Sequence, residues 1–270
     1  MSSNGLRDTV GAAKIFVAQR WLGVTPDLTQ HRYLLSERIC QQTGYSVSYG
    51  PFKGMLIDPD SSWSAADRGA MILGLYESEV LAALVLACDG QRTLIDVGAA
   101  DGYYAVGAVH SGLVPAAVCF EMTPQGQEVI RANAVRNAVS DRITILGEAT
   151  DSFLDDIPAD LWTEDSPSVF IFDIEGAEFS LLTQEVLRRL RQSHVIVELH
   201  EFTATDSSRA RDLIRNAEAE FDVSIVGTGT RDPSSRPELT AWSDDDRWLL
   251  MSEGRPYLMR WLILTPRASV

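Results

Sequence analysis

The chain has 270 residues, of which 45% are hydrophobic and 23% charged, and these proportions are ordinary for a folded globular protein. Its formal net charge of -15 repels phosphate backbones, so a nucleic-acid partner is not expected. No apolar run is long enough to cross a membrane, and three cysteines without a CxxC spacing indicate a reducing, cytoplasmic setting.

The first part of the chain mixes helical and irregular patterns. Apolar residues recur at helical intervals within residues 1–45, whereas turn-forming residues alternate with aromatic ones over 46–75. A second helical pattern covers 77–87. We therefore expect residues 1–75 to form an N-terminal helical cap with a substrate-side segment, and residues 76–270 to form the main domain.

Strands and helices then alternate to the end of the chain. The predicted strands are 93–97, 116–121, 142–148, 168–175, 194–200, 222–227 and 257–266. One predicted helix begins near Gly102, and three more cover 124–137, 177–190 and 208–221. This alternation predicts an α/β fold with a mostly parallel seven-stranded sheet, ending in a hairpin-like pair. The polar segment 228–257 is interpreted as a long loop that acts as a lid.

The turn after the first strand reads Asp-Val-Gly-Ala-Ala-Asp-Gly. Ligands of open parallel sheets bind beyond the carboxyl ends of the strands, and Gly98 and Gly102 allow the backbone to approach one closely. A dinucleotide turn would carry a second glycine where Ala100 stands, and Asp101 would repel a pyrophosphate. A carboxylate here suits a sulfonium or an ammonium group instead.

Acidic residues also end the next two predicted strands. Glu121 is placed to accept hydrogen bonds from two ribose hydroxyls, as acids at this position do in nucleotide-binding sheets. Glu148 follows the third strand and is placed to meet an adenine amino group. A glycine turn followed by an acid about twenty residues later occurs in binders of NAD and of S-adenosylmethionine, so the spacing leaves both open.

Three motifs together resemble the FkbM-type family of class I S-adenosylmethionine-dependent methyltransferases. They are Asp-Val-Gly-Ala-Ala-Asp-Gly at 96–102, Asp-Ile-Glu-Gly-Ala-Glu at 173–178 and Val-Ile-Val-Glu-Leu-His-Glu-Phe at 195–202. The resemblance covers roughly residues 70–226. This chain departs from the family pattern at Asp101, where the family more often has asparagine.

The resemblance implies a Rossmann-like class I methyltransferase sheet with its last strand antiparallel, and 76–270 as the cofactor-binding domain. It also implies methyl transfer from S-adenosylmethionine to a hydroxyl on a small molecule such as a natural product or a sugar. The implied cofactor site comprises Asp96, Gly98, Ala99, Asp101, Gly102, Glu121, Met122, Glu148, Ala149 and Asp173. Asp173 would lie beside the sulfonium.

An alcohol acceptor must lose its proton, and candidates for this step end the fourth and fifth strands. Asp173, Glu198 and His200 are the candidate catalytic residues, with His200 favoured as the base because neighbouring carboxylates raise its basicity. Two other readings stay open. His200 is a hydrogen-bonded residue at a strand end, or Asp173, Glu198, His200 and Glu201 bind Mg²⁺.

The acceptor side is predicted from residues outside these motifs. Aromatic side chains at a pocket rim suit a partly apolar molecule, and nearby charges would orient it. The candidate substrate-binding residues are Tyr49, Phe52, Lys53, Trp63, Glu175, Glu201 and Arg255. The alternative is that the early aromatic residues pack locally and that Arg255 belongs to a surface hairpin.

Two other functions compete with the methyltransferase. A nicotinamide-dependent oxidoreductase would share the sheet, but the missing glycine and Asp101 count against it. A non-catalytic cofactor-binding scaffold would share the site but not the turnover. The expected partner is a small-molecule hydroxyl acceptor, and the helical cap is compatible with a homodimer.

Overall fold

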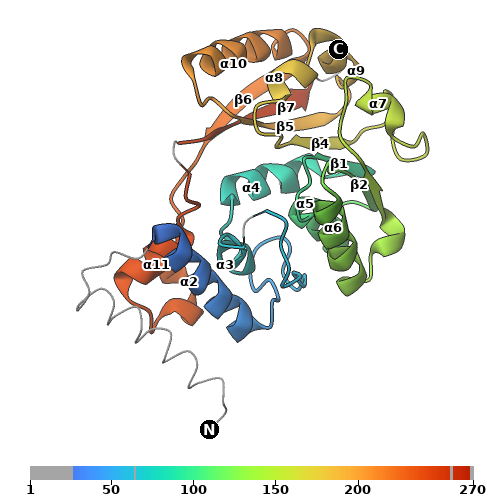
Figure 1. Cartoon of the computed structure of the whole chain (residues 1–270). Coiled ribbons are helices and arrows are strands. Elements are labelled where there is room, and N and C mark those ends of the chain that lie inside the picture. The colour runs from blue at the N-terminus through green and yellow to red at the C-terminus, as the bar shows by residue number, and fades with distance from the viewer. Residues whose placement is uncertain (1–26, 64, 256–257, 268–270) are drawn as a thin grey trace.

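A computed structural model describes residues 27–63, 65–255 and 258–267. The helical pattern predicted before residue 27 lies outside the described residues. Seven described strands form one sheet (Figure 1). They are β1 (Thr93–Val97), β2 (Ala116–Phe120), β3 (Ile143–Leu146), β4 (Val169–Phe172), β5 (His194–Leu199), β6 (Phe221–Gly227) and β7 (Arg260–Pro266).

The strand order is β3-β2-β1-β4-β5-β7-β6. Strands β1 to β5 pair in parallel, whereas β7 runs antiparallel to both β5 and β6. The seven-stranded, mostly parallel sheet with an antiparallel last strand is therefore confirmed. The order reverses at β1, so the carboxyl ends of β1 and β4 diverge at a topological switch point, where ligands bind in such sheets.

Helices cover both faces of the sheet (Figure 1). One face packs against α4 (Ser78–Ala87), α5 (Tyr103–His110) and α6 (Pro124–Arg136). The other packs against α7 (Phe153–Asp156), α8 (Glu178–Leu181), α9 (Gln184–Arg189) and α10 (Ala204–Ala217). Alternate residues of a strand point to opposite faces, so Leu94 joins the first core and Ile95 the second. This two-sided burial explains the almost wholly apolar strands.

The helix predicted over 177–190 is interrupted. It forms α8 and α9, with Leu182 and Thr183 between them. The Thr183 side chain accepts a hydrogen bond from the Val186 amide at 3.3 Å, so it acts as the N-cap of α9. The apolar stripe still reaches the core, because Leu182 and Val186 are buried.

The segment 228–257 is not the loop that its composition predicts. It contains α11 (Asp244–Met251), which begins at the N-cap Ser243 and has three aspartates in its first turn, where acids are favoured. Figure 1 shows α11 beside α2 (Leu28–Thr43), and a third cluster of buried residues joins them to α3 (Arg68–Ile72). Trp242 is buried there, so this part packs against the N-terminal helices.

No helix among the described residues combines the length and the apolar character needed to cross a bilayer.

Candidate active site

A cavity of about 310 Å³ opens beyond the carboxyl ends of β1, β2, β3 and β4. Its volume lies within the range of small-molecule pockets. The walls come from the turns after these strands, from the start of α5 and from segments around residues 62–76. Lining residues are Ser62, Trp63, Met71, Tyr76, Asp96, Gly98, Ala99, Ala100, Asp101, Tyr103, Tyr104, Phe120, Glu121, Met122, Thr123, Glu148, Ala149, Asp173, Ile174, Glu175 and Ala177.

The turn after β1 brings two strand ends into close contact. Gly98 has φ +87°, and a Cβ atom there would overlap the carbonyl oxygen of Asp173. Ala100 also adopts a positive φ, +47°, which is costly for a residue with a side chain. The glycine is therefore required both by the backbone conformation and by the approach of β4.

Glu121 is fixed by three hydrogen bonds at the cavity wall. One carboxylate oxygen accepts from the Ala100 amide at 3.0 Å. The other accepts from the amide of Thr123 at 2.7 Å and from its hydroxyl at 2.6 Å. The side chain therefore ties the turn after β1 to the turn after β2, and its orientation does not depend on a ligand.

The two aspartates of the first turn have different surroundings. Asp96 is buried and accepts a hydrogen bond from the Ala105 amide at 3.3 Å. Burial, together with the charge of Glu121, raises the pKa of Asp96 to about 7. Asp101 accepts from the Ser62 amide at 2.8 Å and from the hydroxyls of Ser61 and Ser62. Asp101 thus anchors the segment that carries Trp63 to the cavity rim.

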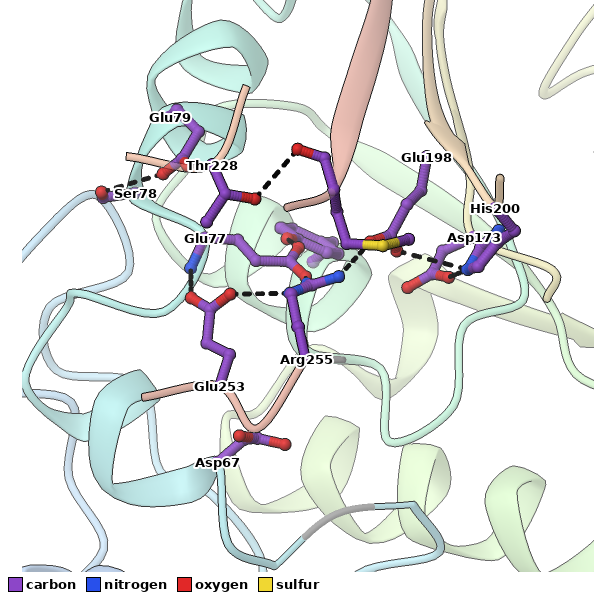
Figure 2. A network of polar contacts seen from close by, with 12 residues as sticks. Asp67, Glu77, Ser78, Glu79, Asp173, Glu198, His200, Thr228, Glu253 and Arg255 are labelled. Carbon is purple, nitrogen blue, oxygen red and sulfur yellow. Dashed lines mark hydrogen bonds and ion pairs between the residues drawn. The ribbon is translucent and has the colours of Figure 1, made fainter. Parts of the chain in front are cut away.

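A buried acidic group lies behind the end of β4 (Figure 2). Glu77 and Glu198 are almost fully buried and lie near Asp173, with one oxygen of each within 4.8 Å of the others. Burial and the neighbouring charges raise the pKa of Asp173 to about 7, and those of Glu77 and Glu198 to about 8.

Arg255 pairs with this group from the C-terminal segment (Figure 2). Its guanidinium contacts Glu77 and Glu198, and its Nε donates to Glu253 at 2.8 Å. Glu253 also accepts from the Nε of Arg231 at 2.8 Å, and Nη1 of Arg231 lies 2.9 Å from Glu79. Two arginines therefore face four glutamates and the adjacent Asp173, so carboxyl groups outnumber basic groups here, in keeping with the raised pKa values of Glu77, Glu198 and Asp173.

His200 lies beside the cavity and not on its wall, because its side chain is only 3% exposed. Its Nδ1 is 3.1 Å from Glu178, and its Nε2 is 3.4 Å from Asp173. Glu175 and Glu198 lie 3.7 Å from Nε2. Burial alone would lower the pKa of His200, but the hydrogen bond and charge of Glu178 outweigh it and raise that pKa above its ordinary value.

Two sets of side chains have the spacing of metal ligands among the described residues. They are Asp173 with Glu175 and His200, and Asp173 with Glu77 and Glu198. Glu201 belongs to neither set. Its carboxylate instead accepts two hydrogen bonds from the Arg260 guanidinium, at 2.6 and 2.8 Å. The sequence-derived Mg²⁺ set is therefore not brought together as a whole.

Of the residues predicted for the cofactor, all but Gly102 line the cavity; Gly102 is the N-cap of α5 just behind it. The predicted catalytic residues Glu198 and His200 lie one side chain behind Asp173. Residues that sequence reasoning missed also line the cavity: Met71, Tyr76, Tyr103 and Tyr104. The two tyrosines of α5 directly follow Gly102, so their position in the turn motif was an available signal.

The predicted substrate residues divide into two groups. Trp63 and Glu175 line the cavity, whereas the other five do not. The Tyr49 hydroxyl lies 3.1 Å from Glu238, and the Phe52 ring is fully buried against Tyr103. Local packing therefore accounts for both aromatic residues.

The other three outlying residues are Lys53, Glu201 and Arg255. Lys53 is exposed and Glu201 is paired with Arg260. Arg255 reaches the cavity only through Glu77 and Glu198.

No family model matches this sequence, and no curated protein matches it. Among solved structures, cofactor-bound Rv0187 from MTB is similar with a TM-score of 0.50 at 15% identity, covering 95% of this chain and 97% of that one. An O-methyltransferase from Bacillus cereus in complex with SAH has a TM-score of 0.47 at 13% identity, covering 94% and 97%. With the strand order described above, the predicted Rossmann-like sheet of the class I methyltransferase type is confirmed as the fold.

Proposed function

We propose that this chain is an S-adenosylmethionine-dependent methyltransferase that methylates a hydroxyl of a small molecule, as its FkbM-type motifs imply. One observation carries the proposal. Six carboxylate residues line the cavity, and no lysine, arginine or histidine does so in the described part of the chain. Such a wall repels phosphates and attracts a ligand that carries positive charge and hydroxyl groups.

The cavity residues fit this cofactor by type and position. Glu121 would accept from the ribose hydroxyls, because its carboxylate already faces the cavity from the end of β2. Glu148 would meet the adenine, and the backbone around Gly98 would approach the amino-acid tail. When bound, the cofactor supplies a methyl group on a positively charged sulfur.

The acceptor side combines aromatic rings with a basic carboxylate. Tyr76, Tyr103 and Tyr104 form an apolar wall beside Asp173, which suits an uncharged organic acceptor. A carboxylate with a pKa near 7 is well matched to accept the proton of a hydroxyl at neutral pH. Asp173 therefore takes the proton in this proposal, since His200 does not reach the cavity.

The nicotinamide alternative meets a specific obstacle. A dinucleotide brings a pyrophosphate to the turn after the first strand, and here that turn holds Asp96 and Asp101 with Glu121 beside them. The carboxylate of Asp101 has no basic partner among its hydrogen bonds. Electrostatic repulsion thus favours S-adenosylmethionine over NAD.

Calorimetric titration with S-adenosylhomocysteine tests the proposal, with NAD in parallel. We expect binding of the first ligand alone, and a loss of affinity in Glu121→Ala. The matched control is Glu201→Gln, which removes an acid outside the cavity and should leave the affinity unchanged. Binding of NAD instead would refute the proposal. If S-adenosylhomocysteine binds but a broad screen of acceptors, with or without Mg²⁺, finds no methyl transfer, the result would favour the non-catalytic cofactor-binding scaffold.

A further inference from the structure

The hexapeptide at 173–178 wraps around one histidine. Asp173 and Glu175 approach Nε2 of His200 at 3.4 and 3.7 Å, and Glu178 approaches Nδ1 at 3.1 Å. Glu198 on β5 lies 3.7 Å from Nε2, and the ring of Phe202 packs at 5.4 Å. Three acids of one short motif therefore face the same imidazole from opposite edges, as Figure 2 shows for Asp173.

The backbone of the motif is bent to make this possible. Glu175 has φ +54° and Gly176 has φ +102°, both in the left-handed region. The bend carries the chain around the ring, from the cavity side at Asp173 to the buried side at Glu178. A non-glycine residue held in this region is costly, so the surrounding contacts must maintain it.

Glu178 is the most completely held member of the motif. It is fully buried, and one oxygen accepts from the His200 backbone amide at 2.9 Å while also facing Nδ1. The other oxygen accepts from the Gly176 amide at 2.8 Å. An ionised carboxylate can only accept, so Nδ1 must be the protonated nitrogen. The lone pair of neutral His200 then lies on Nε2 and faces Asp173.

We propose that Glu178 is a positioning residue: it holds the Nδ1–H tautomer of His200 so that Nε2 receives the proton that Asp173 takes from the acceptor. This inference rests on the proposed function. As the acceptor oxygen bonds to the methyl carbon and the carbon–sulfur bond breaks, the acceptor proton moves to Asp173. It then moves to Nε2, which leaves Asp173 ionised and His200 positively charged beside Glu178, Glu175 and Glu198.

The geometry supports this transfer in two ways. The distance of 3.4 Å from Nε2 to Asp173 is slightly long, as catalytic contacts often are before the substrate binds. Carboxylates lie within 3.7 Å of both ring nitrogens, so a proton that reaches Nε2 leaves a positive imidazole surrounded by negative partners. Orientation of a histidine by a buried carboxylate is the same device that fixes the tautomer in serine hydrolase triads.

Nuclear magnetic resonance of the full chain labelled with ¹⁵N in its histidine rings tests the tautomer directly. The chain has four histidines, and a His200→Gln variant assigns the signals of His200. At pH 8 we expect wild-type His200 to carry its proton on Nδ1. Glu178→Gln should remove that preference, because the amide mismatches either Gly176 or His200. The matched control, Glu175→Gln, alters the other edge of the ring and should keep the Nδ1 proton.

A wild-type signal protonated on Nε2 alone would overturn the inference without any variant, so misfolding of Glu178→Gln cannot hide a failure. An unchanged Nδ1 signal in folded Glu178→Gln would overturn it as well. With an acceptor from the screen, Glu178→Gln should lower kcat by roughly 10-fold or more, out of the 10²–10⁴ that base catalysis supplies. Its affinity for S-adenosylhomocysteine should stay unchanged. If the wild type does not bind that ligand, the proposed function fails, whereas the tautomer result still stands.

Discussion

Replacement of Arg255 by methionine should destabilise the fold in a pH-dependent way. The side chains of its partners Glu77 and Glu198 are 1% and 2% exposed, and that of Arg255 is 18% exposed. Removing one partner of a buried ion pair typically costs roughly 3–5 kcal/mol, because the remaining charge stays buried and unpaired. We expect a loss of this size in the free energy of unfolding at pH 9, measured by urea denaturation.

The loss should shrink at pH 6. The pKa values of Glu77 and Glu198 are about 8 in the folded state, so both side chains are mostly protonated at pH 6 and attract Arg255 little. Arg188 pairs with the exposed Glu185, and Arg188→Met is the control from which we expect a much smaller loss. Equal losses in the two variants, or an Arg255→Met loss that is the same at pH 6 and pH 9, would refute this reasoning.

Three further predictions concern the same region. Gly98→Ala should abolish binding of S-adenosylhomocysteine, because the added Cβ atom would overlap the Asp173 carbonyl oxygen at the cavity wall. In the control Gly90→Ala the Cβ atom meets only open space, so we expect a loss of stability of about 1–2 kcal/mol from left-handed strain and unchanged binding. Calorimetric titration of both variants tests this. The wild-type melting temperature should fall between pH 6 and pH 8, because the two buried glutamates paired with Arg255 have raised pKa values and the folded state binds more protons than the unfolded state; a rising curve would contradict this. Asp101→Ala should speed hydrogen exchange of the Ser62 amide, because Asp101 accepts a hydrogen bond from that amide at 2.8 Å. An unchanged exchange rate would show that other contacts hold this segment.

The sheet was predictable because its signals are local. Each central strand is an uninterrupted apolar run, and each turn after it carries glycine or an acid. The same holds for the cavity wall, since Asp96 lies near the end of β1, and Glu121 and Glu148 come just after β2 and β3. Parallel strands place such residues at one edge of the sheet, whatever the rest of the chain does.

Glu77 could not be found in this way. It lies 178 residues from Arg255, and neither residue stands in a motif that indicates the other. The structure does place carboxylates around His200, as the sequence suggested, but its distance from the cavity depends on how the turn at 173–178 bends. The helix α11 was missed although Ser243 and the acids after it form a helix start, because the polar composition of the segment suggested a loop.

The position of β7 has a consequence for the order in which the molecule can be completed. It is the last described strand in the chain, yet it lies between β5 and β6 in the sheet. A ribosome releases the chain from its N-terminus, so β5 and β6 emerge with no strand between them and with open edges. Glu198 on β5 likewise lacks its arginine partner until Arg255 has been made, and Arg255 comes only five residues before β7. The arginine ion pairs of the buried acidic group can therefore form only after Arg255 has been made, at the same stage as the insertion of β7 between β5 and β6.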